Sequence, residues 1–118
     1  MAFGLQEAQG DTVLTLTAAS ATASSGAIAA QGTAAYVLCM VQVSAITGTS
    51  PTLVVKLQES SDNSSWTDIT GATTATLNAA GSAVFFGKPT KGYVQAVATI
   101  GGTTPAVTAN IAAIVFPE

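Results

Sequence analysis

The chain has 118 residues, of which 48% are hydrophobic, and its mean hydropathy is +0.51. This length fits one domain with one buried core, and the composition excludes a disordered polar chain. Only 8% of the residues are charged: there are three lysines, no arginine and no histidine, and the net charge is −3. Because phosphate groups are bound mainly by Lys and Arg, this composition argues against nucleic acid and against an anionic membrane surface as partners.

The low charge leaves the surface to be built from Ser, Thr, Ala, Gly, Gln and Asn. Such a surface repels close neighbours little, and its desolvation costs little free energy. Two explanations stay open at this point. An assembly covers much of the surface, or the protein simply has a bland β-sheet surface rich in Ala and Thr.

The sequence predicts neither an exported nor a membrane-spanning chain. It has no run of about 20 apolar residues that could form a spanning helix. Its start, MAFGLQEAQG, lacks the basic and apolar parts of a signal peptide, so we expect a chain that works without Sec export. Cys39 is the single cysteine, which excludes an internal disulfide, and within AYVLCMVQV we expect it to be a small buried apolar residue.

The first half of the chain predicts strands separated by segments of small residues. TVLTLT at 12–17 alternates apolar and polar residues, which is typical of a strand. Residues 18–33 are mostly Ala, Ser, Thr and Gly, and they predict a long loop with room for a short strand at 26–30. AAYVLCMVQVS at 34–44 is the strongest strand pattern, apolar on both faces at its start. TLVVKLQES at 52–60 alternates again after a turn.

The second half predicts a hairpin followed by further short strands, with Gly, Pro, Ser or Asn between them. The hairpin lies at 59–69, and the strands that follow are expected at 73–77, 81–87, 92–100 and 106–116. No segment has a helical period over three turns. We therefore predict one all-β domain over residues 1–118, with an N-terminal arm and the loop at 18–33. Its expected architecture is an antiparallel two-sheet β-sandwich, jelly-roll-like, with seven to eight strands.

One polar stretch, ESSDNSSWTDI at 59–69, holds three of the six acids and the single Trp. Glu59, Asp62, Asn63 and Asp68 carry the hard oxygen ligands that Ca²⁺ prefers. Their spacing does not match the Ca²⁺ loop pattern D-x-[DN]-x-[DN]-G, and no bidentate Glu closes the stretch. We therefore predict no metal site.

A sugar-binding role for the same stretch is a second hypothesis. The Asp-box of sialidases reads S-x-D-x-G-x-x-W, whereas here Trp66 comes one residue early and Ser64 stands in place of Gly. A lone Trp can stack on a sugar, although a Trp at a strand start more often covers one end of the core. The other aromatic candidates for a glycan surface are Tyr36 and Tyr93, and we expect both to lie in the core because their strands are apolar.

A turn between two strands accounts for every residue of this stretch. Asp62 and Asn63 favour turn conformations and can bond their own backbone, and the Ser side chains can satisfy the free amides around them. Trp66 then enters the next strand, and Asp68 faces away from its neighbours there. We therefore interpret the stretch as a hairpin turn.

The sequence predicts a protein that is not an enzyme. It has no His for general base catalysis and no Cys–His or Ser–His pair. Glu59 and Asp68 could pair across the hairpin, but we expect them to be solvated turn charges. IGGTTP is a hairpin turn and not a phosphate loop, because no strand-to-helix junction surrounds it. We therefore assign no catalytic, cofactor-binding or metal-binding residue.

Two segments taken together resemble small virion structural proteins of tailed bacteriophages. In those proteins a V-x-L-Q-x-S-x-D strand and turn leads to a Trp, as in TLVVKLQESSDNSSWTDITG. A later Y-V-x-x-x-x-x-x-G-G-T-x-P hairpin leads to a final apolar strand, as in GYVQAVATIGGTTPAVTANIAAIV. The resemblance covers residues 36–116 and is strongest with capsid decoration (cement) proteins that have a jelly-roll β-sandwich.

The resemblance implies a structural protein that binds the major capsid protein on the outer surface of the head, as a homotrimer, and braces the shell. It implies a location on the virion after assembly in the host cytoplasm, with no cofactor, nucleic acid or membrane as partner. The N-terminal arm and the small-residue loop would order on contact with the capsid. Aromatic residues are only 6% of the chain, so binding would rest on many copies and a wide area. Two other functions stay open: a tail, fibre or baseplate component, and a carbohydrate- or surface-binding module.

Overall fold

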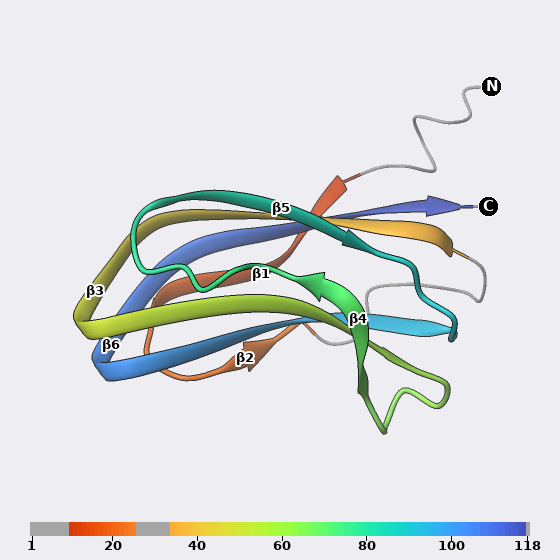
Figure 1. Ribbon diagram of the computed structural model, residues 1–118, viewed down its shortest axis with the longest axis horizontal. Helices are drawn as coiled ribbons and strands as arrows, with labels where there is room; N and C mark the ends of the chain where they lie inside the picture. Colours follow the sequence, from red (N-terminus) through yellow and green to blue (C-terminus); the bar gives the residue numbers. More distant parts are fainter. Residues whose placement is uncertain (1–9, 26–33, 118) are drawn as a thin grey trace.

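A computed structural model of the chain describes residues 10–25 and 34–117. In these ranges it contains strands and no helix, and therefore no helix that could cross a membrane. All of its strand pairs are antiparallel. In chain order the strands are β1 (Gly10–Ala19), β2 (Ala23–Ser24), β3 (Ala34–Ser60), β4 (Thr67–Thr73), β5 (Gly81–Gly87) and β6 (Tyr93–Pro117) (Figure 1).

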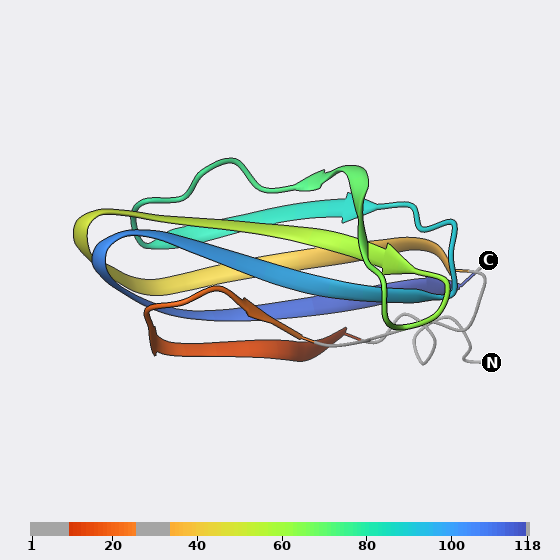
Figure 2. The ribbon, with the colours of Figure 1, turned by 90° about the horizontal axis from the view of Figure 1, so that it is seen from below.

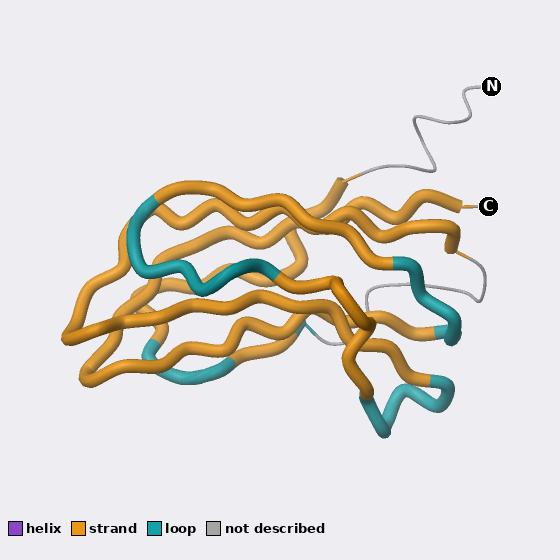
Figure 3. The backbone as a smooth tube through the Cα atoms, viewed as in Figure 1, coloured by secondary structure: helices purple, strands orange, loops and turns teal. Residues whose placement is uncertain are grey.

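The two longest strands, β3 and β6, form one antiparallel ribbon. Their paired residues run from Ala34 opposite Pro117 to Ser60 opposite Tyr93. Midway along its length the ribbon folds back on itself, and Figures 1 and 3 show both strands reversing direction at the same end of the molecule. Each half of the ribbon therefore lies in a different layer.

The two bends of the ribbon depend on residues with positive φ angles. These are Gly48 (φ 122°) and Ser50 (φ 49°) in β3, and Gly102 (φ 108°) and Thr104 (φ 45°) in β6. Glycine adopts such angles without a steric cost. A Cβ atom on Gly102 would lie 2.6 Å from the Ser50 carbonyl oxygen, and one on Gly48 would lie 2.8 Å from the Thr104 carbonyl oxygen. The backbones of the two bends are therefore in close contact.

Each half of the ribbon is flanked by two shorter strands. In the first layer, β1 pairs with residues 107–114 of β6, and β5 pairs with residues 37–43 of β3. In the second layer, β2 pairs with residues 97–98 of β6, and β4 pairs with residues 56–59 of β3. Figure 2 shows β1 and β5 at opposite sides of the molecule, so they form the two edges of the first layer.

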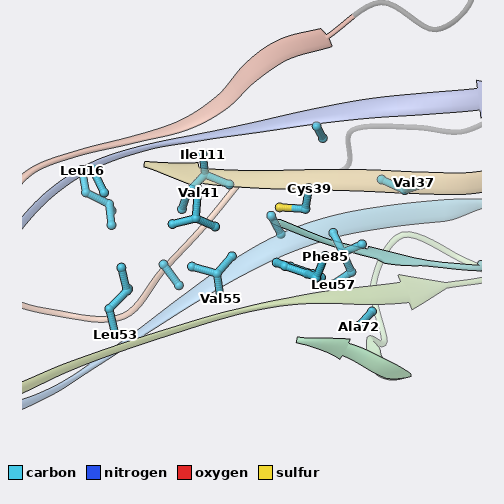
Figure 4. Packing of buried hydrophobic residues seen from close by; sticks show 14 of the residues in the cluster. Leu16, Val37, Cys39, Val41, Leu53, Val55, Leu57, Ala72, Phe85 and Ile111 are labelled. Atoms are coloured by element: carbon cyan, nitrogen blue, oxygen red, sulfur yellow. The ribbon is translucent and has the colours of Figure 1, made fainter. Parts of the chain in front are cut away.

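The core lies between the two layers and follows the period-2 alternation of the strands. Cys39 and Val41 from the first half of β3 point toward Val55 and Leu57 of its second half (Figure 4). Burying a side chain the size of Val or Leu stabilises the fold by about 1.5–3 kcal/mol, so the facing halves hold each other in place. Further side chains of the cluster with 0% exposure are Val37, Leu53, Val94, Ala96, Ala98, Val107 and Ile111.

The all-β, antiparallel prediction is confirmed, whereas the predicted number of strands is not. The described residues form six strands, because the predicted strands 34–44 and 52–60 are the two halves of β3, and 92–100 and 106–116 are the two halves of β6. The predicted strand at 73–77 does not form. β4 ends at Thr73, and beyond it Leu77 makes only an isolated bridge to Leu53.

The predicted loop at 18–33 is shorter at its start than expected. Ala18 and Ala19 still belong to β1, and Ala23–Ser24 form β2 beside β6. Residues 26–33, with the short strand expected at 26–30, lie outside the described residues, and so does the N-terminal arm.

Replacing Gly102 by Ala should destabilise the bend. The new Cβ atom would meet the backbone of the facing bend, and Ala would be held at a positive φ angle. We expect the free energy of unfolding, measured by urea denaturation, to fall by about 2 kcal/mol. Gly71→Ala is the matched control, because Gly71 has φ of 82° but no atom within 4 Å of the new Cβ position. It should lose about 1 kcal/mol, and equal losses in both variants would contradict close contact between the bends.

Candidate interaction surface

The turn that joins β3 to β4 is organised by one carboxylate. Asp62 Oδ1 accepts hydrogen bonds from the backbone N–H groups of Ser64 (2.9 Å) and Ser65 (3.0 Å) and from the Ser60 hydroxyl (2.9 Å). Asn63 has φ of 60°, a left-handed conformation that Asn tolerates well. These contacts confirm the prediction that the stretch is a hairpin turn, since its polar side chains satisfy its own backbone.

The residues considered as Ca²⁺ ligands do not converge. Glu59 Oε1 accepts a hydrogen bond from the backbone N–H of Thr90 at 2.7 Å, which ties the β5–β6 connection to β3. Glu59 lies opposite Thr67 and Asp68 lies opposite Gln58, so the two carboxylates do not pair across the hairpin. Within residues 10–25 and 34–117, no group of three or more His, Cys, Asp or Glu side chains could hold a metal ion.

A row of polar side chains crosses the outer face of the second layer. Gln95 Nε2 donates to Gln58 Oε1 and Gln58 Nε2 donates to Asp68 Oδ1, each at 2.9 Å. Lys56 Nζ lies 3.1 Å from the same Asp68 oxygen. The hydrogen bond from Gln58, followed by that from Lys56, lowers the pKa of the Asp68 carboxyl. The row joins β6, β3 and β4, and each of its side chains has a partner within it.

Cys39 is a core residue, as the sequence predicted. Its side chain is fully buried in the first layer, and burial raises the pKa of its thiol to about 12. Because the thiolate is the reactive form, a thiol with so high a pKa is inert at neutral pH. Its contribution is to packing.

The expectation that both tyrosines lie in the core is wrong. Tyr36 is 46% exposed and Tyr93 is 39% exposed, because each occupies an outward position of its strand. The inward positions beside them are taken by Val37 and Val94, which are fully buried. Trp66 is half-buried and is not among the side chains that pack against the core cluster, so the structure does not support its expected role as a cover for the core.

Four exposed apolar side chains and the half-buried Leu38 gather on the outer face of the first layer. We call this set the apolar face; it consists of Tyr36, Leu38 and Met40 of β3 and Val84 and Phe86 of β5. Strand pairing places Leu38 opposite Phe86 and Met40 opposite Val84. The Tyr36 and Phe86 rings lie edge to face with centroids 5.7 Å apart. The β5 members are the most exposed, Val84 at 63% and Phe86 at 59%.

The apolar face continues onto β6 and ends toward the bend. On β6, Ile114 lies opposite Leu38 and Ala112 lies opposite Met40, and both are half-buried. In the next outward row toward the bend, Gln42 stands between Ser82 and Asn110, and the face becomes polar there. At the other end, Lys88 Nζ lies 5.5 Å from the centroid of the Tyr36 ring, a cation–π contact.

The apolar face could have been predicted from the sequence. Both alternating sets of residues in AYVLCM are apolar, and so are Val84 and Phe86 on the outward side of GSAVFFG. One of the two sets fills the core, and the other is left outside. This makes the apolar face, and not the 59–69 turn, the best candidate for a functional surface.

Comparisons with known proteins identify a fold and no family. Neither a protein-family model nor a curated protein matches the sequence. Among solved structures, the chain is similar to the PBSX exported protein XepA, with a TM-score of 0.72 and 12% sequence identity. The similarity covers 95% of this chain and 38% of XepA, so the chain spans little more than a third of that protein.

Two further solved structures are similar at a greater distance. A Bacillus endospore appendage protein of disulfide-linked pili has a TM-score of 0.49 and 19% identity, over 92% of this chain and 87% of that one. A chain of the empty cowpea mosaic virus particle has a TM-score of 0.43 and 16% identity, over 73% and 57%. Of these three likenesses, only that to XepA is close enough to show a shared fold, and at its low identity it shows the fold alone.

Replacing Asp62 by Ala should loosen the β3–β4 turn in a pH-dependent way. Its hydrogen bonds, that from Ser65 most of all, lower the pKa of this carboxyl in the folded state. The stabilisation is therefore fully present above the unfolded-state pKa of about 3.9 and is lost as the pH falls through the lower folded-state pKa. We expect a lower melting temperature for Asp62→Ala at pH 7 and a smaller difference near pH 2. Ser61→Ala, in the same exposed turn, should match the parent, and a pH-independent effect of Asp62→Ala would contradict this role.

Proposed function

We propose that this chain is a non-enzymatic structural protein of a tailed-phage particle, which decorates and stabilises the outer surface of the capsid. The observation that carries the proposal is the apolar face of Tyr36, Leu38, Met40, Val84 and Phe86 on an antiparallel all-β fold. An exposed apolar patch bordered by polar residues is typical of a surface that binds another protein. The jelly-roll β-sandwich of the resembling cement proteins is part of this proposal, and the two-layered ribbon is compatible with it.

The low charge of the chain supports a role in a dense assembly. Only 8% of the residues are charged, so the protein can lie against a shell and against neighbouring copies with little repulsion. Three of the acids bond within the chain: Asp62 in its turn, Asp68 to Gln58 and Lys56, and Glu59 to Thr90. Modest binding by each copy would suffice, because many copies on one shell act together.

The proposed partners are the major capsid protein of a phage head and further copies of this chain, arranged as a homotrimer. The proposed location is the outer capsid surface of the virion, after assembly in the host cytoplasm. The proposal includes no cofactor, no nucleic acid and no membrane. With three lysines and no arginine, the chain has few groups to bind phosphate, which supports a place outside the shell and away from the packaged DNA.

A carbohydrate- or surface-binding module is the second candidate function, and one observation favours it. Tyr93 is 39% exposed and lies two residues from Gln95, on the same side of β6 as the polar row of Gln58 and Asp68. An exposed aromatic ring beside amide groups can stack on a sugar and bond its hydroxyls. A tail, fibre or baseplate component is a third candidate, which shares the structural role and differs in its place on the particle.

The location on the particle can be tested directly. Particles released by the strain that encodes this chain would be purified on a density gradient and labelled with an antibody against the chain and gold. We expect gold on the outer surface of the heads, seen by electron microscopy. Gold confined to tails would contradict the decoration role in favour of the tail candidate, and particles without gold would contradict a virion role altogether.

The apolar face can be tested with two variants that lose exposed aromatic rings from opposite layers. Phe86→Ser removes a ring from the apolar face, and Tyr93→Ser removes one from the outer face of the second layer. Both side chains are exposed, so we expect melting temperatures close to that of the parent. Phe86→Ser should reduce the amount of chain that co-purifies with particles at least tenfold, and Tyr93→Ser should leave it unchanged. Equal retention of both variants would contradict a role of this face.

A further inference from the structure

The sheet edges of this protein differ in how well they are protected. Natural proteins protect edge strands with bulges, charges, prolines or shortness, because an open edge pairs with other chains. β1 has two register shifts against β6 and a positive φ angle at Ala18. β2 has two residues. β4 has a register shift against β3, carries Asp68 and has a positive φ angle at Gly71. Each of these edges is interrupted, charged or short.

The edge formed by β5 lacks the bulges, charges, prolines and shortness that protect an edge strand. All seven residues of β5 pair with residues 37–43 of β3 without a register shift, and GSAVFFG contains no charge and no proline. Among residues 10–25 and 34–117, no strand pairs with its other side. Its outward side chains, Val84 and Phe86, are 63% and 59% exposed. A regular, uncharged and apolar edge of this length is typical of strands that associate.

We propose that the free edge of β5 pairs with the β5 edge of a second copy of this chain, antiparallel and across a two-fold axis. Identical antiparallel strands are self-complementary, which makes such a contact isologous. In the register that pairs all seven residues, the axis passes the middle residue, Val84, which then lies opposite the partner's Val84. Phe86 lies opposite the partner's Ser82.

The distribution of charge permits this contact. The charged residue that follows β5 most closely is Lys88, and in the full-length register it lies opposite the partner's Ala80 and not opposite a like charge. The pairing also continues the first layer from one copy into the next, so the two apolar faces become neighbours on one surface. Two copies would therefore present a wider apolar area than one.

The two-fold contact goes beyond the proposed function and does not depend on a capsid. It predicts an even number of copies in solution: a dimer if it forms alone, and a hexamer if the proposed trimer forms as well. An odd number of copies cannot satisfy every β5 edge in this way.

The first test measures the mass of the full chain by light scattering over a range of concentrations, for the parent and two variants. Val84→Lys places like charges opposite each other at the axis, whereas Thr15→Lys places the same charge at an exposed outward position of the other edge strand, β1. We expect an even-numbered mass for the parent and for Thr15→Lys, and half that mass for Val84→Lys. Circular dichroism should show the same strand content in all three proteins.

The second test is disulfide cross-linking, which does not rely on a disruptive substitution. Directly opposite Cβ atoms in an antiparallel pair lie about 4.5–5.5 Å apart, close to the spacing that a disulfide needs. Val84→Cys should therefore form a covalent dimer on mild oxidation, and Thr15→Cys should not. Cys39 is fully buried and does not compete.

Three results would overturn the inference: a parent that is monomeric or trimeric at every concentration, an even-numbered mass that Val84→Lys leaves unchanged, or no covalent dimer from Val84→Cys. All of these measurements use free protein. Failure here would leave the virion proposal standing, since gold labelling of particles tests that proposal separately.

Discussion

The close contact between the two bends of the β3–β6 ribbon is the constraint on which the rest of the structure depends. Gly102 passes so near the Ser50 carbonyl that a Cβ atom would collide with it, and Gly48 approaches Thr104 in the same way. Because both strands bend at the same place, the two halves of the ribbon face each other. In each strand every second side chain then points into the space between the two layers, and these side chains together form a single core. The four shorter strands pair with the edges of the two layers that the ribbon forms.

The same folding determines the chemistry of the two outer faces. The outer face of the first layer carries the apolar face of Tyr36, Leu38, Met40, Val84 and Phe86, whereas the outer face of the second layer carries the hydrogen-bonded row of polar residues. A chain that had only to be soluble would place polar residues on both faces. Exposing an apolar face to water is unfavourable in free energy, and this unfavourable term is removed only when another surface covers the face. The difference between the faces is therefore the clearest structural sign of an interaction.

Three carboxylates and one lysine make local contacts within the fold. Asp62 holds a turn, Glu59 ties the β5–β6 connection to β3, and Asp68 joins the polar row, so the carboxylates fix connections at the margins of the fold. Lys88 lies over the Tyr36 ring at the border of the apolar face. A chain with only 8% charged residues has little charge with which to steer distant partners or to repel close ones. That property suits a protein that works packed among others.

The sequence by itself determined most of the strand segments, the turn at 59–69 and the burial of Cys39, because alternation and the Asp62–Asn63 pair act locally. It missed β2 and predicted a strand at 73–77 that does not form. It determined the limits of β5 as well, since glycines bound that strand on both sides. Only the tertiary structure decided that the predicted strands join into two long ones, and which side of AYVLCM faces the core. Both alternating sets of residues there are apolar, so the alternation alone does not indicate which set faces the core. The second half of the ribbon settles the choice by covering Val37, Cys39 and Val41, which leaves Tyr36 and Met40 exposed.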